Sequence, residues 1–411
     1  MIRINPFRAI RPAPDHAETV ASVPYDVVNR TEAAQLASGN SESFLHVVRS
    51  EIDLPDEIDL YDDRVYEKAA ENFNRLRTER ILVQDEEPCL YLYRQIMRNR
   101  SQVGLVACCH IDDYENNLIK KHEKTRQAKE DDRTRHVLAI NANSGPVFLT
   151  YRCAGVIDNL IENARRTDQP EYDFTAPDGV RHTVWRIDET GPLVHAFKSV
   201  PCAYVADGHH RSASAWRAGK QKRDANPQHT GNEEYNWFLC VLFPDEQLSI
   251  LPYNRVISNL NGLTVNQAVE QLKTVGSVEP TDNPKPDRPG TFCFYFGKGK
   301  WVRVAVREDL IDHDDPIASL DVAILQNQIL GPIFAIGDPR TDDRIDFVGG
   351  IRGTSELEKR VDHERFACSV SMYPTSIGQL LSVADAGLVM PPKSTWFEPK
   401  LRSGLFAHLL D

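Results

Sequence analysis

Apolar and polar positions alternate along this chain with two different periods. Residues 61–80 place apolar side chains at intervals of three or four residues: Tyr61, Val65, Ala69, Phe73 and Leu76. This spacing predicts an amphipathic helix. Residues 89–96 and 102–109 are apolar runs of strand length with a short polar turn between them. They predict two neighbouring strands.

Weaker patterns fill the rest of the first 220 residues. Residues 19–28 have the composition of a strand, and Asn29 or Thr31 is placed to cap the helix that follows. Residues 122–138 predict a helix although nearly all of their side chains are polar. Residues 201–206 predict a short apolar strand, with a helix directly after it.

A further set of elements begins after about residue 255. Residues 264–274 predict a helix with Thr264 as its cap, and residues 317–330 predict another. Residues 291–296 and 301–306 alternate between apolar and polar side chains across a glycine-rich turn, which predicts a hairpin.

This mixture of short strands and helices predicts an α/β (α+β) fold. The chain has 411 residues, which suits two or three domains at roughly 100–200 residues each. We expect the domains to be residues 1–255 and 256–411, with the second helping to complete a substrate pocket.

Composition narrows the function. The formal net charge is −12, and a dedicated nucleic-acid binder needs a basic surface, so nucleic acid is not an expected partner. No apolar run reaches the roughly 18–20 residues of a membrane span, and residues 1–8 lack the apolar segment of a signal peptide. We therefore expect a cytoplasmic protein. The eight cysteines form no C-x-x-C pair, which favours reduced, buried thiols.

The most specific local feature is a run of five residues between an apolar strand and an alanine-rich helix: Asp207, Gly208, His209, His210 and Arg211. A strand end beside a helix N-terminus is a favoured ligand position, where free N–H groups attract an anion. Gly208 lets a ligand approach the backbone, Arg211 can hold phosphate oxygens, and Asp207 can hold Mg²⁺. Two other interpretations stay open: a helix cap with surface histidines, and a zinc site on Asp207, His209 and His210.

Cationic side chains recur in the polar segment 120–136 at spacings of four and three residues: His122, Arg126, Lys129, Arg133 and His136. On a helix they would share one face. Such a stripe suits a phosphate ligand, and the alternative is a solvated helix with charge pairs between successive turns. Glu123 is placed beside the stripe to act as a general base toward a hydroxyl.

Two weaker segments are also candidates. Lys393, Ser394 and Thr395 open a tail, continued by residues 396–400, that is rich in hydrogen-bond donors and flanked by prolines. This tail either clamps a substrate or forms a packed loop. Residues 24–26 either line a pocket or end a strand. The usual glycine-rich phosphate motifs are absent from the sequence.

His122 and Glu123, followed downstream by the run 207–211, resemble the free-serine kinases of the ParB/sulfiredoxin-like fold. In that family a His-Glu pair opens a helix, and a later strand delivers Asp-Gly-His-His-Arg to the next helix. The resemblance implies a mixed-sheet nucleotide-binding core with a second α/β block. About 80 residues separate the two motifs here, more than in the compact kinases, and residues beyond about 256 have no counterpart there.

The whole chain is also similar to long bacterial proteins grouped as a domain of unknown function, through residues 6–8, 24–27 and 390–395.

The kinase resemblance implies transfer of a phosphoryl group from ADP or ATP, with Mg²⁺, to the hydroxyl of free L-serine or a similar metabolite. The catalytic residues would be His122, Glu123 and Asp207, with Asp207 also holding the metal. The nucleotide would be bound by Asp207, Gly208, His209, His210, Arg211, Arg126, Lys129 and Arg133. The substrate would be bound by His136, Lys393, Ser394 and Thr395.

Two alternatives stay open beside the kinase. One is a ParB-related nucleotide-sensing module that phosphorylates no metabolite. The other is a sulfiredoxin-like enzyme, which needs a reactive cysteine where His209 and His210 stand.

Overall fold

The computed structural model describes residues 1–167 and 169–411, which divide into two compact units. The first unit comprises Met1–Leu248 and Pro399–Asp411, and the second comprises Ser249–Glu398. The division thus differs from the expected 1–255 and 256–411 in the final segment, which returns to the first unit. The reason is backbone pairing: β21 (His408–Leu409) pairs with β7 (Ala142–Asn143), and Ala407 pairs with Ile10.

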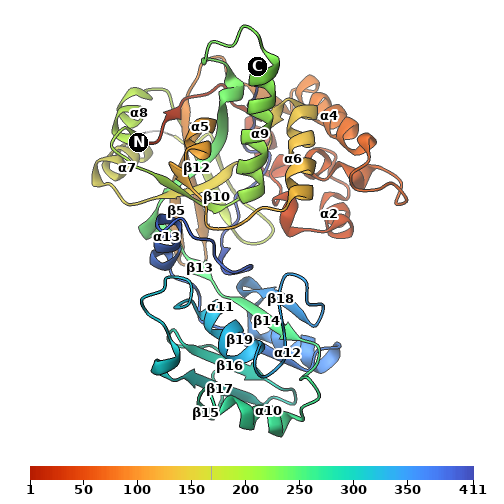
Figure 1. The fold of residues 1–411 in the computed structure, drawn as a ribbon. Coiled ribbons are helices and arrows are strands. Elements are labelled where there is room, and N and C mark those ends of the chain that lie inside the picture. The colour runs from red at the N-terminus through yellow and green to blue at the C-terminus, as the bar shows by residue number, and fades with distance from the viewer. Residues whose placement is uncertain (168) are drawn as a thin grey trace. The chain divides into compact units, whose positions relative to one another are not determined.

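The first unit is a mixed α/β structure built on one large sheet (Figure 1). In order across the sheet, its strands are β6 (Ile119–Lys120), β11 (Ala203–Asp207), β8 (Val147–Tyr151), β12 (Trp237–Pro244), β5 (Arg100–His110), β4 (Leu90–Met97), β10 (Arg181–Ile187) and β9 (Tyr172–Thr175). β1 (Ile4–Asn5) also pairs with β5. The pairs β6–β11 and β8–β12 are parallel, and the other pairs are antiparallel. β2 (Ile10–Pro12) and β3 (Leu82–Gln84) form a separate ladder.

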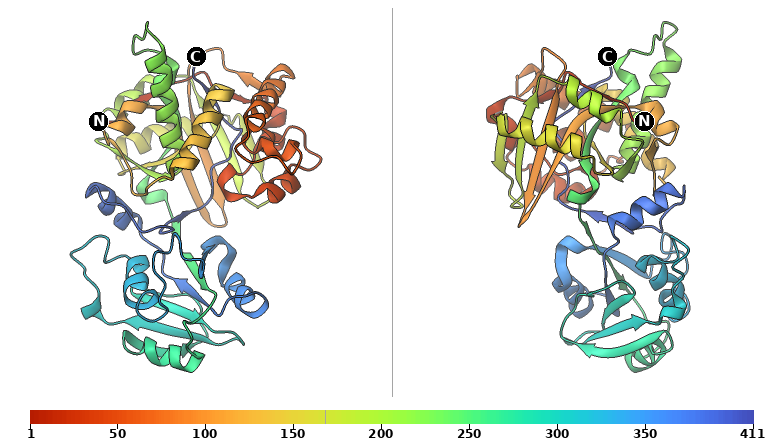
Figure 2. Two further views of the ribbon diagram at one scale, coloured as in Figure 1. Left: turned by 45° about the vertical axis from the view of Figure 1, so that its right-hand side comes forward. Right: turned by 90° about the vertical axis from the view of Figure 1, so that its left-hand side faces the viewer.

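Helices flank this sheet. They are α1 (Ala17–Val20), α2 (Arg30–Ala37), α3 (Leu45–Val48), α4 (Asp63–Thr78), α5 (Ile111–Glu115), α6 (Gln127–Ile140), α7 (Gly155–Thr167), α8 (Gly191–Phe197) and α9 (His209–Ala225). The views in Figures 1 and 2 agree that α6 and α9 lie side by side, and α4 packs against α6. Since α9 also packs on β8 and β12, it joins the sheet to the N-terminal helices.

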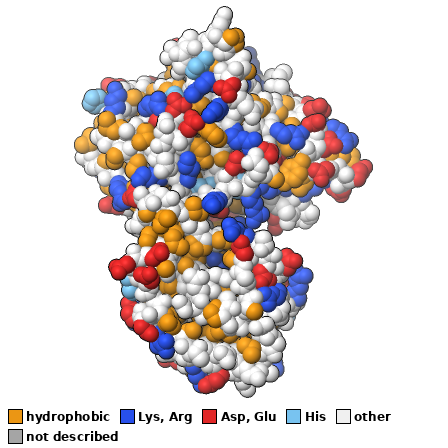
Figure 3. Space-filling model, viewed as in Figure 1, with side chains coloured by type: hydrophobic (Ala, Val, Ile, Leu, Met, Phe, Trp, Pro, Cys, Tyr) orange, Lys and Arg blue, Asp and Glu red, His pale blue; other side chains and the backbone are white. Residues whose placement is uncertain are grey.

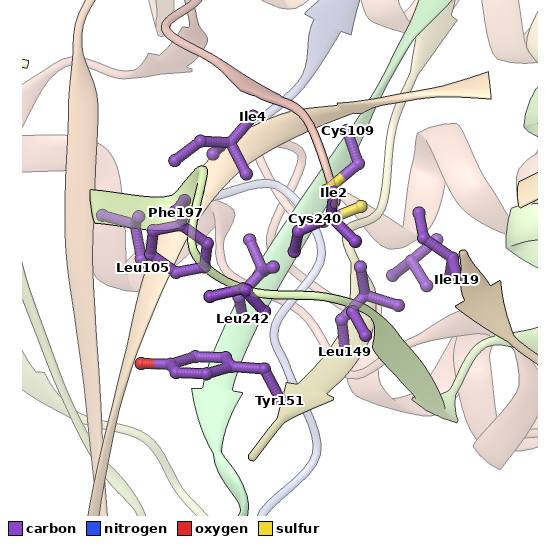
Figure 4. Packing of buried hydrophobic residues seen from close by; sticks show 14 of the residues in the cluster. Ile2, Ile4, Leu105, Cys109, Ile119, Leu149, Tyr151, Phe197, Cys240 and Leu242 are labelled. Atoms are coloured by element: carbon purple, nitrogen blue, oxygen red, sulfur yellow. The ribbon is translucent and has the colours of Figure 1, made fainter. Parts of the chain in front are cut away.

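Two apolar clusters stabilise the first unit. In the larger one, Leu105, Leu149 and Leu242 come from β5, β8 and β12 and meet Phe197 of α8 (Figure 4). All four side chains are fully buried. The second cluster lies among α2, α3 and α4 and includes Phe44 and Phe73. Burial of apolar surface on this scale is what holds the sheet and helices together.

The second unit has its own sheet, in the order β15 (Gly276–Thr281), β17 (Trp301–Val306), β16 (Thr291–Tyr295), β19 (Cys368–Met372), β14 (Tyr253–Ile257) and β18 (Ile345–Gly349). Every pairing in it is antiparallel. Its helices are α10 (Val265–Leu272), α11 (Asp321–Ile324), α12 (Gly353–His363) and α13 (Ile377–Asp385), and α11 continues into a π-helical segment, η7 (Leu325–Leu330). β13 (Ile250–Leu251) pairs with β20 (Trp396–Phe397).

The strongest sequence patterns are confirmed. The helix over 61–80 is α4, the strand pair 89–96 and 102–109 is β4 and β5, and the hairpin 291–306 is β16 and β17. Asn29 caps α2 and Thr264 caps α10, each in a reciprocal capping box.

Other expectations hold only in part. Residues 19–28 are predicted to form a strand leading into a turn; the turn is present as a 3₁₀ turn at Tyr25–Val27, but the strand is not, because α1 occupies residues up to Val20. The helix expected over 122–138 begins only at Gln127, because Ile119 and Lys120 pair with β11 and residues 121–126 are needed to leave the sheet. The helix expected over 317–330 is present from Asp321 to Leu330, as one turn of α-helix that continues into the π-helical segment η7.

The surface agrees with the mixed composition. Acidic and basic side chains are interspersed over the face drawn in Figure 3. Among the residues described, no helix combines the length and apolar character needed to cross a membrane. Six of the eight cysteines are buried, Cys202 is half-buried and Cys153 is exposed, and each carries a free thiol.

Candidate functional site

The candidate site forms where β11 ends and α9 begins. β11 lies between β6 and β8, so its apolar side chains are buried and the strand delivers Asp207 to the edge of the core. Gly208 follows with φ +92°, a left-handed conformation that favours glycine. The chain then enters α9 at His209. The first N–H groups of a helix have no partner within it, so this turn presents donors and the positive end of the helix dipole.

Asp207 is held between two cations. Lys400 Nζ lies 3.1 Å from its Oδ2, and an Arg211 guanidinium nitrogen lies 3.8 Å from the same oxygen. The Gly208 N–H donates to Oδ1 at 2.9 Å. Burial alone would raise the pKa of Asp207, but Lys400 and Arg211 outweigh it and hold that pKa well below the usual range. The carboxylate is therefore charged under all ordinary conditions.

Two buried histidines lie beside this carboxylate. The rings of His122 and His209 pack edge to face, with centroids 4.4 Å apart. His209 Nδ1 is 3.7 Å from Oε2 of the exposed Glu123. Both nitrogens of His122 and Nε2 of His209 are buried without a hydrogen-bond partner among the described residues. Burial lowers the pKa of His209 to about 4 and the pKa of His122 well below its usual value, so both rings are neutral at pH 7.

Arg211 is fixed by three oxygens. It donates to the Pro146 carbonyl at 2.6 Å, and a guanidinium nitrogen lies 3.5 Å from Asp26 and 3.8 Å from Asp207. Burial alone would lower its pKa, but Asp26 and Asp207 raise it. Its Nε is buried and has no hydrogen-bond partner within residues 1–167 and 169–411. A donor left unsatisfied costs free energy, so Arg211 retains a capacity for an additional acceptor.

A cavity of about 40 Å³ lies next to Arg211. Its polar lining includes Tyr25, Arg133, Asn143, Ser144 and Ser403. The lining comes from α6, α9, the turn after β7 and the returning C-terminal segment. Its apolar lining includes Val48, Val137 and Phe238, and the small volume suits a small molecule better than a nucleotide base.

The structure brings the segments 122–136 and 207–211 together, though not as a cationic stripe. His122 and Arg126 precede α6 rather than lying on it. The Arg126 backbone N–H donates to His210 Nε2 at 3.1 Å, and the Arg126 side chain is exposed. Lys129 lies over the Tyr61 ring at 5.4 Å, away from the site.

The remaining members of the expected stripe, Arg133 and His136, line the cavity. Arg133 pairs with Asp132 at 2.9 Å and stacks over the Tyr25 ring at 4.4 Å. His136 Nε2 lies 2.9 Å from the Val47 carbonyl oxygen, to which it donates. The positive charge of Arg133 is therefore largely compensated by Asp132 and Tyr25 within the protein, as a buried cation requires.

Lys393, Ser394 and Thr395 belong to the second unit. Ser394 donates to the Pro391 carbonyl at 2.6 Å, and its own carbonyl accepts from Thr375. Lys393 lies over the Tyr253 ring at 5.3 Å. These contacts describe a packed loop.

The residues present constrain any metal. Among those described, no group of three His, Cys, Asp or Glu side chains could hold an ion, which argues against the zinc interpretation of Asp207, His209 and His210. Asp207 offers one carboxylate, and Lys400 already contacts it. Mg²⁺ commonly takes one or two protein carboxylates and completes its shell with substrate phosphates and water. Asp207 fits that role only if phosphate oxygens supply further ligands.

Sequence reasoning did not assign several residues to the site. Lys400 belongs to the donor-rich tail expected to clamp a substrate or form a packed loop, but it lies 193 positions from its partner Asp207, and only the return of residues 399–411 brings them together. Asn143, Ser144 and Ser403 carry no motif. Tyr25 and Asp26 had a signal in the Pro-Tyr-Asp segment, one of whose two interpretations was a pocket wall.

A large mixed sheet whose buried strand leads through an Asp-Gly-His-His-Arg turn into a helix N-terminus defines a mixed α/β protein. The chain belongs to the family described as "Protein of unknown function (DUF1015)", whose model matches residues 4–323. No curated protein matches it.

Three solved structures resemble the chain weakly. A conserved hypothetical protein from Pyrococcus furiosus is 12% identical with a TM-score of 0.36, covering 76% of this chain and 98% of its own. SbnI with a C-terminal truncation, from Staphylococcus aureus, is 13% identical with a TM-score of 0.37, covering 74% and 87%. A free serine kinase in complex with AMP is 12% identical with a TM-score of 0.33, covering 74% and 91%. None of these similarities defines the function of this chain.

Proposed function

We propose that the first unit is a small-molecule kinase, which transfers a phosphoryl group from ATP or ADP to the hydroxyl of a small metabolite such as L-serine. The observation that carries the proposal is the juxtaposition at the start of α9. There an unsatisfied buried Arg211 nitrogen, free helix N–H groups and the exposed Glu123 carboxylate surround one turn. Phosphoryl transfer needs chiefly positioning and charge neutralisation, and these groups supply both.

In this proposal the nucleotide phosphates bind at the β11–α9 turn. The N–H groups of the first turn of α9 donate to phosphate oxygens, and Gly208 leaves the space for that approach. A Cβ added at Gly208 would lie 3.3 Å from Arg211 Nε and 3.4 Å from its Cζ, next to the donor that faces the anion. Arg211 and Lys400 neutralise negative charge. Mg²⁺ bound to the nucleotide would take Asp207 as its protein ligand and add further neutralisation.

Glu123 is the proposed general base. The acceptor hydroxyl gives its proton to the Glu123 carboxylate, the hydroxyl oxygen forms a bond to the terminal phosphorus, and the bond from that phosphorus to the bridging oxygen breaks. The nucleotide leaves one phosphate shorter, and the phosphate ester of the metabolite remains. Neutral His209, 3.7 Å from Glu123, positions the carboxylate without removing its charge. The small cavity beside Arg211 is the proposed acceptor pocket.

The test is a product assay on the full chain. ATP or ADP, Mg²⁺, L-serine and a panel of hydroxylated metabolites are incubated with the protein, and products are read by phosphorus NMR and mass spectrometry. Glu123→Gln should lower the transfer rate about a hundredfold and leave the nucleotide Kd nearly unchanged. Arg211→Met should weaken nucleotide binding about tenfold.

Matched controls are Glu162→Gln and Arg181→Met, which alter exposed ion pairs with Arg166 and Asp173. Both should retain full activity. Nucleotide binding without any phosphorylated product would favour the nucleotide-sensing module instead. Neither binding nor product, or full transfer by Glu123→Gln, would refute the kinase.

A further inference from the structure

The second unit contains a buried arginine with no carboxylate partner. Arg255 lies on β14, a strand paired on both sides, and is 4% exposed. Its guanidinium donates to the carbonyls of Tyr253 and Lys393 and lies 4.7 Å over the Phe347 ring. No acidic side chain in the described part of the chain forms an ion pair with it. Burial lowers the pKa of Arg255 to about 9, which shows how poorly its charge is compensated.

This arrangement differs from that of other buried arginines in the protein. Arg11, 9% exposed, pairs with Asp85 at 2.9 Å, and Arg402, 5% exposed, pairs with Asp178. A buried charge without a counter-ion is costly, so proteins normally pair it or use it to bind something. Two carbonyl acceptors also leave some of the five guanidinium N–H donors of Arg255 unused.

Arg255 lines a cavity of about 310 Å³ that lies wholly within the second unit. The walls are largely apolar and include Ile317, Val322, Leu330 and Pro391. This volume is at the lower end of the roughly 300–1,000 Å³ typical of small-molecule sites. Of the three charged residues that line it, Asp338 and Arg340 pair with each other, which leaves the Arg255 charge to fix the orientation of a ligand whose body is apolar.

The π-helical segment η7 forms one side of the cavity. The Gly331 N–H donates to the Gln326 carbonyl at 2.9 Å, the i to i+5 bond of a wide turn. The Gln326 side-chain amide donates to the carbonyls of Ile336 and Gly337, which holds the neighbouring loop against the segment. Asn327 on the next position is exposed and lies at the rim. π-turns inside helices occur frequently at functional sites.

We propose that this cavity binds a small carboxylic acid, with its carboxylate on Arg255 and its apolar body against the walls. A carboxylate is favoured over a phosphate because only one cation is uncompensated. The other arginine at the cavity, Arg340, is 57% exposed in its side chain and already pairs with Asp338 at 2.7 Å. One guanidinium balances a monoanion and would leave a dianion with excess charge in an apolar cavity. This site is independent of the phosphoryl transfer proposed for the first unit.

The test is a binding measurement on the full chain by isothermal titration calorimetry and saturation-transfer NMR. The probes are straight-chain carboxylates from acetate to hexanoate, the primary alcohols of equal length, and inorganic phosphate. We expect at least one acid to bind, and its matched alcohol to bind about tenfold more weakly or worse. Arg255→Met should weaken acid binding about tenfold, while Arg340→Met should change it little.

If Arg255→Met fails to fold, a second variant still tests whether the acid binds in this cavity. Asn327 is exposed, so Asn327→Trp should preserve the fold while its indole fills the rim and weakens acid binding. Four outcomes would overturn the proposal. They are no acid binding to the wild type, equal binding of acid and alcohol, tighter binding of phosphate than of every acid, or unchanged acid binding in a folded Arg255→Met or Asn327→Trp protein.

Discussion

Mild acid should destabilise the first unit through three buried histidines. His136, His182 and His209 are 4%, 0% and 6% exposed. Burial lowers their pKa values to about 4, 3 and 4, with Arg133, Arg402 and His210 adding to the respective shifts. Each folded-state pKa thus lies below the ordinary value of 6.5 for histidine. Below pH 6.5 the unfolded chain therefore binds protons that the folded unit does not.

The sign and size follow from that difference. Stability is fully present above the unfolded pKa and is lost as the pH falls toward the folded pKa. Between pH 7 and pH 5, each histidine costs about 2 kcal/mol, and the three together about 6 kcal/mol. That is a large share of the roughly 5–15 kcal/mol typical of a domain. The contribution of His46 to stability has the opposite pH dependence. Its hydrogen bond to Asp53 outweighs burial and raises the pKa of His46, so its stabilising contribution is lost as the pH rises.

The assay is urea unfolding at pH 7, 6 and 5, with hydrogen–deuterium exchange of peptides from β10 and α9 to isolate the first unit. His136→Gln keeps a donor for the Val47 carbonyl but cannot titrate, so it should remove about 2 kcal/mol of the pH dependence between pH 7 and pH 5. Buried His122, whose pKa is also lowered, adds to that dependence in both proteins. An unfolding midpoint for wild type that is the same at pH 7 and pH 5 would refute the reasoning. The same slope in wild type and His136→Gln would exclude His136 from it.

Three further substitutions test the local geometry. Gly208→Ala forces a side chain into φ +92° beside Arg211, so it should cost about 1–2 kcal/mol and weaken nucleotide binding, as urea unfolding and calorimetry can measure. Asn29→Ala removes the capping box of α2 and should cost about 1 kcal/mol in urea unfolding. Gly219→Ala would place Cβ 2.3 Å from the Tyr235 carbonyl oxygen, so thermal unfolding should show a loss of about 1–3 kcal/mol, and a stable variant would contradict the packing.

The elements that could be predicted from sequence are those whose signal is local. The period of apolar residues over 61–80 and the caps at Asn29 and Thr264 depend on neighbours within a few positions. The turn at residues 207–211 could also be predicted locally, because an apolar strand, a glycine and a helix follow one another directly in the sequence.

The parts that could not be predicted depend on contacts between distant positions. Residues 122–126 look helical, but strand pairing at Ile119 and Lys120 keeps the chain extended before α6. Lys400 carries no motif and gains meaning only from Asp207. In the sequence, Arg255 looks like an ordinary polar position on a strand with alternating side chains. Its lack of a counter-ion becomes visible only in the folded second unit.

Because residues 399–411 return to the first unit, the first unit can be completed only after the second unit has been synthesised. The ribosome synthesises the second unit, Ser249–Glu398, before it synthesises Lys400 and strand β21, which pairs with β7. Domains generally fold as they emerge, yet the first unit must wait for its last strand and for the lysine that contacts Asp207. A nascent chain therefore exposes an open edge at β7 while the second unit is being made. The contact between Lys400 and Asp207 can therefore form only after the second unit has been synthesised.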